Sequence, residues 1–127
     1  MSKFQRFFTC KHCGNMVGLI VNGNSDLICC GEVMTELVPN TVDASQEKHV
    51  PVAKYNNGIL DVQVGSVPHP MTEEHYICWV YVQTKNGGQR KSLKPGEEPK
   101  VQFAIIDDEP IAVFEYCNLH GLWMAEL

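Results

Sequence analysis

Four cysteines near the start of the chain have the spacing of a metal site. The motif "CKHC" supplies Cys10 and Cys13, and fifteen residues later "ICC" supplies Cys29 and Cys30. Four thiolates can surround one ion tetrahedrally, and sulfur-only ligation suits iron or zinc. Because adjacent cysteines of an extended chain point to opposite sides, a site that uses both Cys29 and Cys30 requires a local turn. Such a closed shell predicts a structural or electron-transfer site and leaves His12 as an exposed loop residue.

A second candidate site consists of histidines that lie in predicted loops or at strand edges, together with one cysteine. A β-sandwich gathers its loops at its ends, so side chains from distant parts of the sequence can meet there. Four imidazoles and one thiolate form a ligand set that suits iron with one coordination position open. The alternative is that each histidine, taken singly, is an ordinary surface or core residue and that the cysteine is a small buried hydrophobic residue. The members of this set are His49, His69, His75, Cys117 and His120.

The composition limits the kinds of protein that the chain can be. Its 127 residues, 44% of them hydrophobic, can bury one modest core and carry a small appendage. A formal net charge of -5 argues against binding of nucleic acid or of an anionic membrane. We find neither a secretion signal nor an apolar run of about 18 residues, as a membrane span requires. Reduced cysteines used as metal ligands then predict a cytoplasmic protein.

The elements that must position these residues are strands. Residues 1–37, the head, contain short apolar runs separated by glycines and have too small a core to fold without a metal ion. Residues 38–127, the body, begin with a polar connector and then show period-two alternation at Leu60, Val62 and Val64. The run "HYICWVYVQT" is typical of strands, and "YNNG" and "KNGG" are typical of hairpin turns. We therefore predict an all-β chain whose body is an antiparallel sandwich of six or seven strands, without helices.

Seven short motifs make the whole chain resemble the desulfoferrodoxin family of two-iron superoxide reductases. In chain order they are "CKHCGN", "LICCGE", "EKHVPV", "GSVPHPM", "EEHYICW", "LKPGEEP" and "YCNLHG". The resemblance implies a desulforedoxin-like head whose four cysteines bind one iron, followed by an immunoglobulin-like sandwich. In the body it implies a second iron with the four histidines as equatorial ligands and Cys117 as the axial ligand. His120 is expected to bind through Nδ1 and the other three histidines through Nε2.

The family's activity is the one-electron reduction of superoxide to hydrogen peroxide without evolution of oxygen, a detoxification that protects against oxidative stress. The resemblance assigns Lys48 to steering the anion and to ordering a proton-donating water. It assigns Glu47 to the position opposite the axial ligand in the oxidised protein. It also implies a rubredoxin-like electron donor and a homodimer paired through heads. Asn118 is expected to donate a hydrogen bond toward the sulfur of Cys117.

Two other functions remain open from the sequence alone. The first is a non-catalytic electron carrier, in which both irons only pass electrons. The second is a zinc-stabilised interaction module without redox chemistry. Whether the head iron relays electrons or is only structural also stays open.

Overall fold

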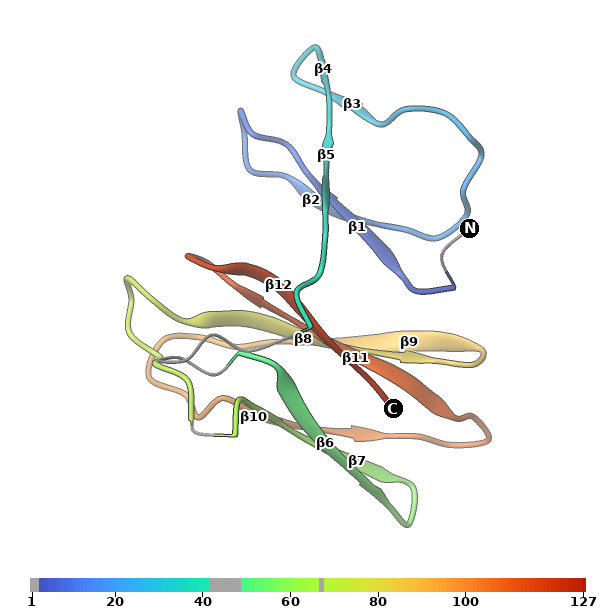
Figure 1. Ribbon diagram of the computed structural model, residues 1–127, viewed down its shortest axis with the longest axis vertical. Coiled ribbons are helices and arrows are strands. Elements are labelled where there is room, and N and C mark those ends of the chain that lie inside the picture. The colour runs from blue at the N-terminus through green and yellow to red at the C-terminus, as the bar shows by residue number, and fades with distance from the viewer. Residues whose placement is uncertain (1–2, 42–48, 67) are drawn as a thin grey trace. The chain divides into compact units, whose positions relative to one another are not determined.

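The computed structural model describes residues 3–41, 49–66 and 68–127, and within these ranges it contains twelve strands and no helix. The chain divides into two compact units, Met1–Val38 and Pro39–Leu127, for which we keep the names head and body. Figure 1 shows both as all-β, in agreement with the predicted fold class. No helix among the described residues is long and apolar enough to cross a membrane.

The head is built on two small antiparallel sheets. The strand β1 lies between β2 and β5, while β3 and β4 form a separate two-stranded ladder. The buried side chain of Phe7 provides the apolar centre of the larger sheet, opposite Gly18 on β2 and Leu37 on β5. The bounds of these strands are β1 Arg6–Thr9, β2 Met16–Leu19, β3 Ile28–Cys29, β4 Glu32–Val33 and β5 Thr35–Leu37.

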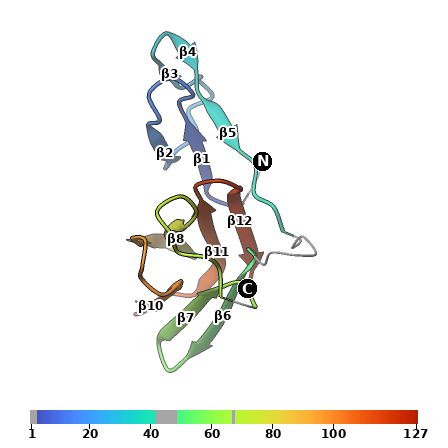
Figure 2. The same cartoon turned by 90° about the vertical axis from the view of Figure 1, so that its left-hand side faces the viewer.

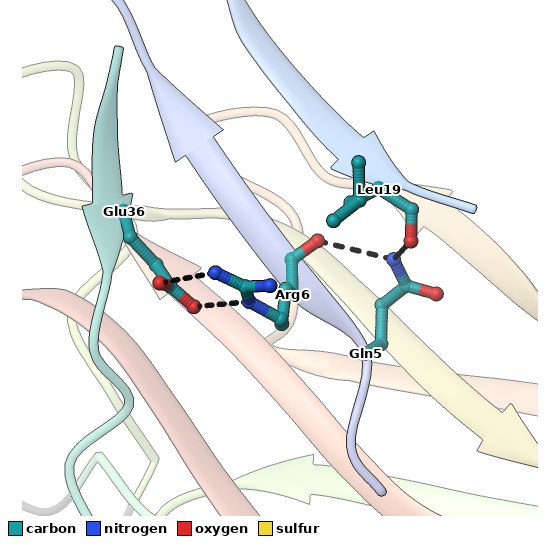
Figure 3. A network of polar contacts seen from close by, with 4 residues as sticks. All are labelled: Gln5, Arg6, Leu19 and Glu36. Atoms are coloured by element: carbon teal, nitrogen blue, oxygen red, sulfur yellow. Dashed lines mark hydrogen bonds and ion pairs between the residues drawn. The ribbon is translucent and has the colours of Figure 1, made fainter. Parts of the chain in front are cut away.

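Polar side chains tie the three strands of the larger head sheet together (Figure 3). The guanidinium of Arg6 donates two hydrogen bonds to the Glu36 carboxylate, from Nε and from Nη2, each 2.8 Å long. The side-chain amide of Gln5 donates to the carbonyl oxygens of Arg6 and Leu19 at 3.1 and 2.8 Å. Because β1 is the central strand, these contacts reach both of its neighbours.

The body is a sandwich of two antiparallel sheets. One sheet has the order β10-β7-β6 and the other the order β12-β11-β8-β9. In Figure 2 the hairpin of β6 and β7 forms one layer, and β11 lies beside β12 in the other. Seven strands agree with the predicted six or seven. Their bounds are β6 Pro51–Asn56, β7 Ile59–Val64, β8 Ile77–Thr84, β9 Gly87–Ser92, β10 Lys100–Ala104, β11 Pro110–Cys117 and β12 Gly121–Glu126.

The predicted alternation places the core between the two sheets. Leu60, Val62 and Val64 are buried on the inner face of β7, as expected, while Asp61 is exposed. Cys117, at the end of β11, belongs to the same buried cluster. The hydrophobic core therefore reaches one of the candidate metal ligands and excludes water from its sulfur.

An irregularity in β8 adjusts the pairing next to Cys117. Tyr116 is opposite Trp79 and Cys117 is opposite Ile77, so Cys78 is the extra residue of a β-bulge. Burial raises the pKa of the Cys78 thiol above its ordinary value. Cys78 is half-buried and lies outside the groups of described residues that could hold a metal.

Candidate metal centres

The four cysteines of the head converge on one point. Their sulfur atoms all lie within 4.8 Å of one another, and the sulfurs of Cys13 and Cys29 are 3.6 Å apart. Sulfurs bound tetrahedrally at about 2.3 Å from one ion are separated by about 3.8 Å. The four thiols therefore fit one metal ion. The cysteines of this group are Cys10, Cys13, Cys29 and Cys30.

Two backbone features bring these cysteines together. Gly14 donates to the carbonyl of Cys10 at 2.9 Å, and Cys10 donates to the carbonyl of Asn15 at 2.8 Å, which closes a tight loop around Cys13. Cys29 pairs with Glu32 across a turn whose two central residues have positive φ, 52° at Cys30 and 77° at Gly31. This two-residue turn has the type I′ pattern and is the local turn that the adjacent cysteines require.

The thiols of the head influence one another's ionisation. Backbone hydrogen bonding from Cys13 lowers the pKa of Cys10 to about 6. Hydrogen bonding to Cys13 and Cys10 raises the pKa of Cys30 to about 12, and hydrogen bonding with Cys10 raises that of Cys29. Thiolates so close together cannot all ionise without a neighbouring cation, so the donor set suits a bound metal. His12 lies outside the set and pairs with Glu32 at 3.0 Å, as expected for an exposed loop residue.

The five predicted donors of the body also meet, although they come from distant parts of the sequence. Each offers one ligand atom, and these atoms lie within 4.8 Å of one another. The sulfur of Cys117 is 3.7 Å from Nε2 of His69 and 3.9 Å from Nδ1 of His120, and that Nδ1 is 3.1 Å from Nε2 of His49. Ligands bound at 2.0 to 2.3 Å around one ion have neighbours about 3 to 4 Å away. The group is His49, His69, His75, Cys117 and His120.

His69 is oriented by its own chain. Its Nδ1 lies 2.7 Å from the carbonyl oxygen of Pro70, so Nδ1 carries the proton and Nε2 faces Cys117. A hydrogen bond of this kind fixes both the tautomer and the ring direction of a metal-binding histidine. The ring is almost fully buried, and prolines flank it on both sides.

His75 is held by a turn and by the hairpin that carries Cys117. Its backbone N–H donates to Oγ1 and to the carbonyl of Thr72, and its carbonyl accepts from the Thr72 N–H. Asn118 accepts from the Tyr76 N–H at 2.9 Å and donates to the carbonyl of Glu74 at 3.0 Å, so it clamps both neighbours of His75. The backbone N–H of Asn118 donates to the Tyr76 carbonyl. These bonds of Asn118 run to the chain around His75, and the expected hydrogen bond to the sulfur of Cys117 stays a prediction.

Cys117 and His120 are placed by the hairpin between β11 and β12. Cys117 pairs with Gly121, and the three residues between them form the loop that carries His120. Gly121 has a φ of 84°, which favours glycine at the point where β12 begins. This short loop brings a buried sulfur and an imidazole nitrogen to 3.9 Å.

The structure also contains site features that the sequence did not indicate. The indole of Trp123 is stacked on the ring of His49, with centroids 4.5 Å apart and an interplanar angle of 12°. Glu115 is fully buried in β11, two residues before Cys117. The only sequence feature that could have indicated a role for Trp123 is its position three residues after His120. The alternation of polar and apolar residues does not distinguish Glu115 from other strand residues. Lys48 and Glu47, which were predicted beside the body iron, lie outside the described residues.

Comparison with known proteins assigns the chain to a family. The family model described as desulfoferrodoxin matches residues 41–126, and that of the desulfoferrodoxin N-terminal domain matches residues 2–37. The desulfoferrodoxin of Syntrophotalea carbinolica is 44% identical over 126 residues, which are 99% of each chain. That of Nitratidesulfovibrio vulgaris is 45% identical over 119 residues, which are 94% of each chain.

A solved structure agrees with the sequence comparison. The superoxide reductase of Treponema pallidum is 37% identical and superposes with a TM-score of 0.85, covering 98% of this chain and all of that chain. The described residues of this chain contain two groups that could hold a metal, the five donors of the body and the four thiols of the head. The chain therefore belongs to the desulfoferrodoxin family.

Proposed function

We propose that this chain, an oxidoreductase, reduces superoxide by one electron to hydrogen peroxide and evolves no oxygen. The observation that carries this function is the convergence of four imidazoles and one thiolate in the body. Five donors leave one position of a six-coordinate ion for an anion from solvent. A purely electron-carrying role is not favoured, because the named structural relatives are superoxide reductases.

The chain binds two iron ions, one in each unit. We assign Cys10, Cys13, Cys29 and Cys30 to the head iron. We assign His49, His69, His75, Cys117 and His120 to the body iron. A ferrous ion held by these five residues would supply the electron that superoxide requires.

The body residues set the charge that superoxide meets. Imidazoles that bind a metal are neutral, so with one thiolate the ferrous site has a formal charge of about +1. This charge attracts an anion although the chain as a whole has a net charge of -5. Cys117 is fully buried, so its thiolate donates electron density to iron without competition from water for its lone pairs.

Lys48 and Glu47 complete the proposed machinery. Lys48 directly precedes His49 in the sequence, so we assign it to the approach of superoxide to the body site. There it steers the anion and orders a water that delivers the protons required for hydrogen peroxide. Glu47 would take the position that the five donors leave open in the oxidised protein and would help to displace the product.

The remaining assignments concern the surroundings of the chain. The head, residues 1–37, is a desulforedoxin-like iron domain, and residues 38–127 are the catalytic domain. A rubredoxin-like protein in the cytoplasm supplies the electrons, because the reaction consumes one electron per superoxide. Two chains pair through their heads, where Ile20 and Val21 are 94% and 77% exposed.

A stoichiometric mixing experiment tests the proposed activity. Anaerobically reduced protein in excess is mixed rapidly with superoxide, and hydrogen peroxide and oxygen are both measured. We expect one hydrogen peroxide per superoxide consumed, no oxygen, and oxidation of the body iron. Half a hydrogen peroxide per superoxide, accompanied by oxygen, would show dismutation and would contradict the proposal.

A further inference from the structure

One side chain contacts two of the proposed iron ligands. Trp123 is only 7% exposed, and its ring lies almost parallel to that of His49. Its indole N–H donates to the carbonyl oxygen of His120 at 3.2 Å. His49 and His120 are 71 positions apart in the sequence. A single residue of β12 thus touches the first and the last ligand of the body site.

The backbone that carries Trp123 is fixed on both sides. On one side Trp123 pairs with Glu115 of β11, and on the other it forms a parallel bridge with Asn40. The N–H of Asn40 donates to the carbonyl of Leu122, and the N–H of Met124 donates to the carbonyl of Asn40, each at 2.9 Å. The indole is therefore attached to a backbone with little freedom to move.

The stacked geometry also favours the metal-bound form of His49. A metal ion withdraws electron density from the imidazole that binds it, and the face of an indole is rich in electrons. Parallel rings at 4.5 Å bring these two faces into contact. Packing in the core alone would also bury Trp123. A contact that only fills the core, however, would have the same strength whether or not His49 binds a metal.

We propose that Trp123 is a positioning residue for the body iron. It holds the ring of His49 by stacking, and it holds the loop of His120 by the hydrogen bond from Nε1. The inference rests on the proposed iron site, and it adds to the five ligands a residue that touches neither iron nor superoxide.

Two variants and one control test this role in the full-length protein. Trp123→Phe keeps a flat ring but lacks the indole N–H, and Trp123→Leu removes both contacts. Trp79→Phe is the matched control, because Trp79 is stacked on Tyr116, with centroids 5.9 Å apart, and Tyr116 is not one of the proposed ligands. The measurements are the iron retained per chain against increasing chelator and the sulfur-to-iron absorption of the oxidised body site. The absorption of the four-thiolate head serves as an internal control.

We expect the affinity of the body for iron to fall about tenfold in Trp123→Phe and about 100-fold in Trp123→Leu, as for other groups that orient metal ligands. The body absorption band should shift in both variants, while the head band and Trp79→Phe stay unchanged. If Trp123→Leu does not fold, Trp123→Phe decides the question. Unchanged affinity and an unchanged body band in Trp123→Phe would overturn the positioning role. Wild-type protein that holds only the head iron would overturn the proposed body site itself, and with it this inference.

Discussion

The histidines of the body are oriented by groups that are not themselves ligands. Pro70 fixes His69 through a carbonyl oxygen, and Asn118 clamps the residues on both sides of His75. Removal of such a group leaves every ligand in place but releases the chain that carries it. Such a change lowers the affinity for the metal before it lowers the stability of the fold.

Asn118→Ala tests this distinction. The variant loses the hydrogen bonds to the Tyr76 N–H and the Glu74 carbonyl, so we expect the affinity of the body for iron to fall about tenfold. Chelator competition on the full chain measures the loss. Asn56→Ala, an exposed residue of β6, is the control and should bind iron as the wild type does. Equal affinities for the two variants would contradict the clamp.

Lys48→Ala tests the steering of superoxide. Loss of the cation should slow the encounter with superoxide several-fold and flatten the dependence of the rate on ionic strength. Rapid mixing of reduced protein with superoxide at several salt concentrations measures both. The control is Lys54→Ala, an exposed lysine of β6, which should keep the wild-type salt dependence. A wild-type rate and salt slope in Lys48→Ala would refute the role.

At the scale of residues, the sequence predicted which metal donors lie together. It did not predict which neighbouring groups hold those donors in place. Cysteines and histidines in loops that meet at one end of a sandwich commonly bind a metal, so the convergence of the donors could be predicted. The structure shows this convergence. The roles of Asn118 and Trp123 depend on distances between loops that no local pattern contains. An asparagine beside a ligand can bond equally well to sulfur or to backbone, and here it bonds to backbone.

At the scale of elements, short turns carry the ligands of the head. The turn at Cys30 and Gly31 needs a left-handed backbone at both residues. Gly31→Ala should therefore destabilise the metal-loaded head by about 1 kcal/mol, because alanine pays a conformational penalty there. Denaturant unfolding, monitored by the absorption of the head iron, measures the change. Gly23→Ala is the control, because Gly23 has open space and an ordinary φ. Equal midpoints for the two variants would contradict the strained turn.

A carboxylate joins the loop before β11 to the hairpin of β8 and β9. Asp108 accepts from the hydroxyl of Thr84 at 2.6 Å and from the N–H of Asn86 at 3.1 Å. The hydrogen bond from Thr84 lowers the pKa of Asp108 below its ordinary value of 3.8. A carboxylate with a lowered pKa stabilises the fold above its ordinary pKa, and this contribution is lost as the pH falls through the lowered value.

Asp108→Asn should accordingly lower the melting temperature of the body at pH 7. The difference from wild type should shrink as the pH falls from the ordinary pKa of 3.8 through the lowered value, where the carboxylate of the folded wild type takes up its proton. Thermal unfolding of metal-free protein across this range measures it without interference from loss of metal in acid. Asp107→Asn, a change at the exposed neighbour, is the control. A difference that is independent of pH would contradict the role of the charge.

The strands could be predicted because their patterns are local. Alternation placed Leu60, Val62 and Val64 on one face of β7, and the glycine-containing turns separated the hairpins. The bulge at Cys78 could not be predicted, because it shows only in the register of β8 against β11. The register shift lies between Tyr116 and Cys117, next to a proposed iron ligand.

At the scale of the whole molecule, the chain has a net charge of -5, and its described residues form two small clusters that could hold a metal ion. The two units differ in what they offer a substrate. The head provides four sulfurs, which close the shell of a tetrahedral ion, whereas the body provides five donors and leaves room for a sixth ligand. Chemistry with superoxide therefore belongs to the body, and the head is suited to structure or electron transfer.

The central claim is that five side chains, spread from His49 to His120, bind one iron ion. An anomalous difference map from crystals of protein purified without added metal, recorded on both sides of the iron absorption edge, tests it most directly. We expect one iron peak among the four sulfurs of the head and a second within bonding distance of Nε2 of His49, His69 and His75, Nδ1 of His120 and the sulfur of Cys117. A body without an iron peak, or an iron that leaves Cys117 or any of these imidazoles unbound in the reduced protein, would contradict the claim.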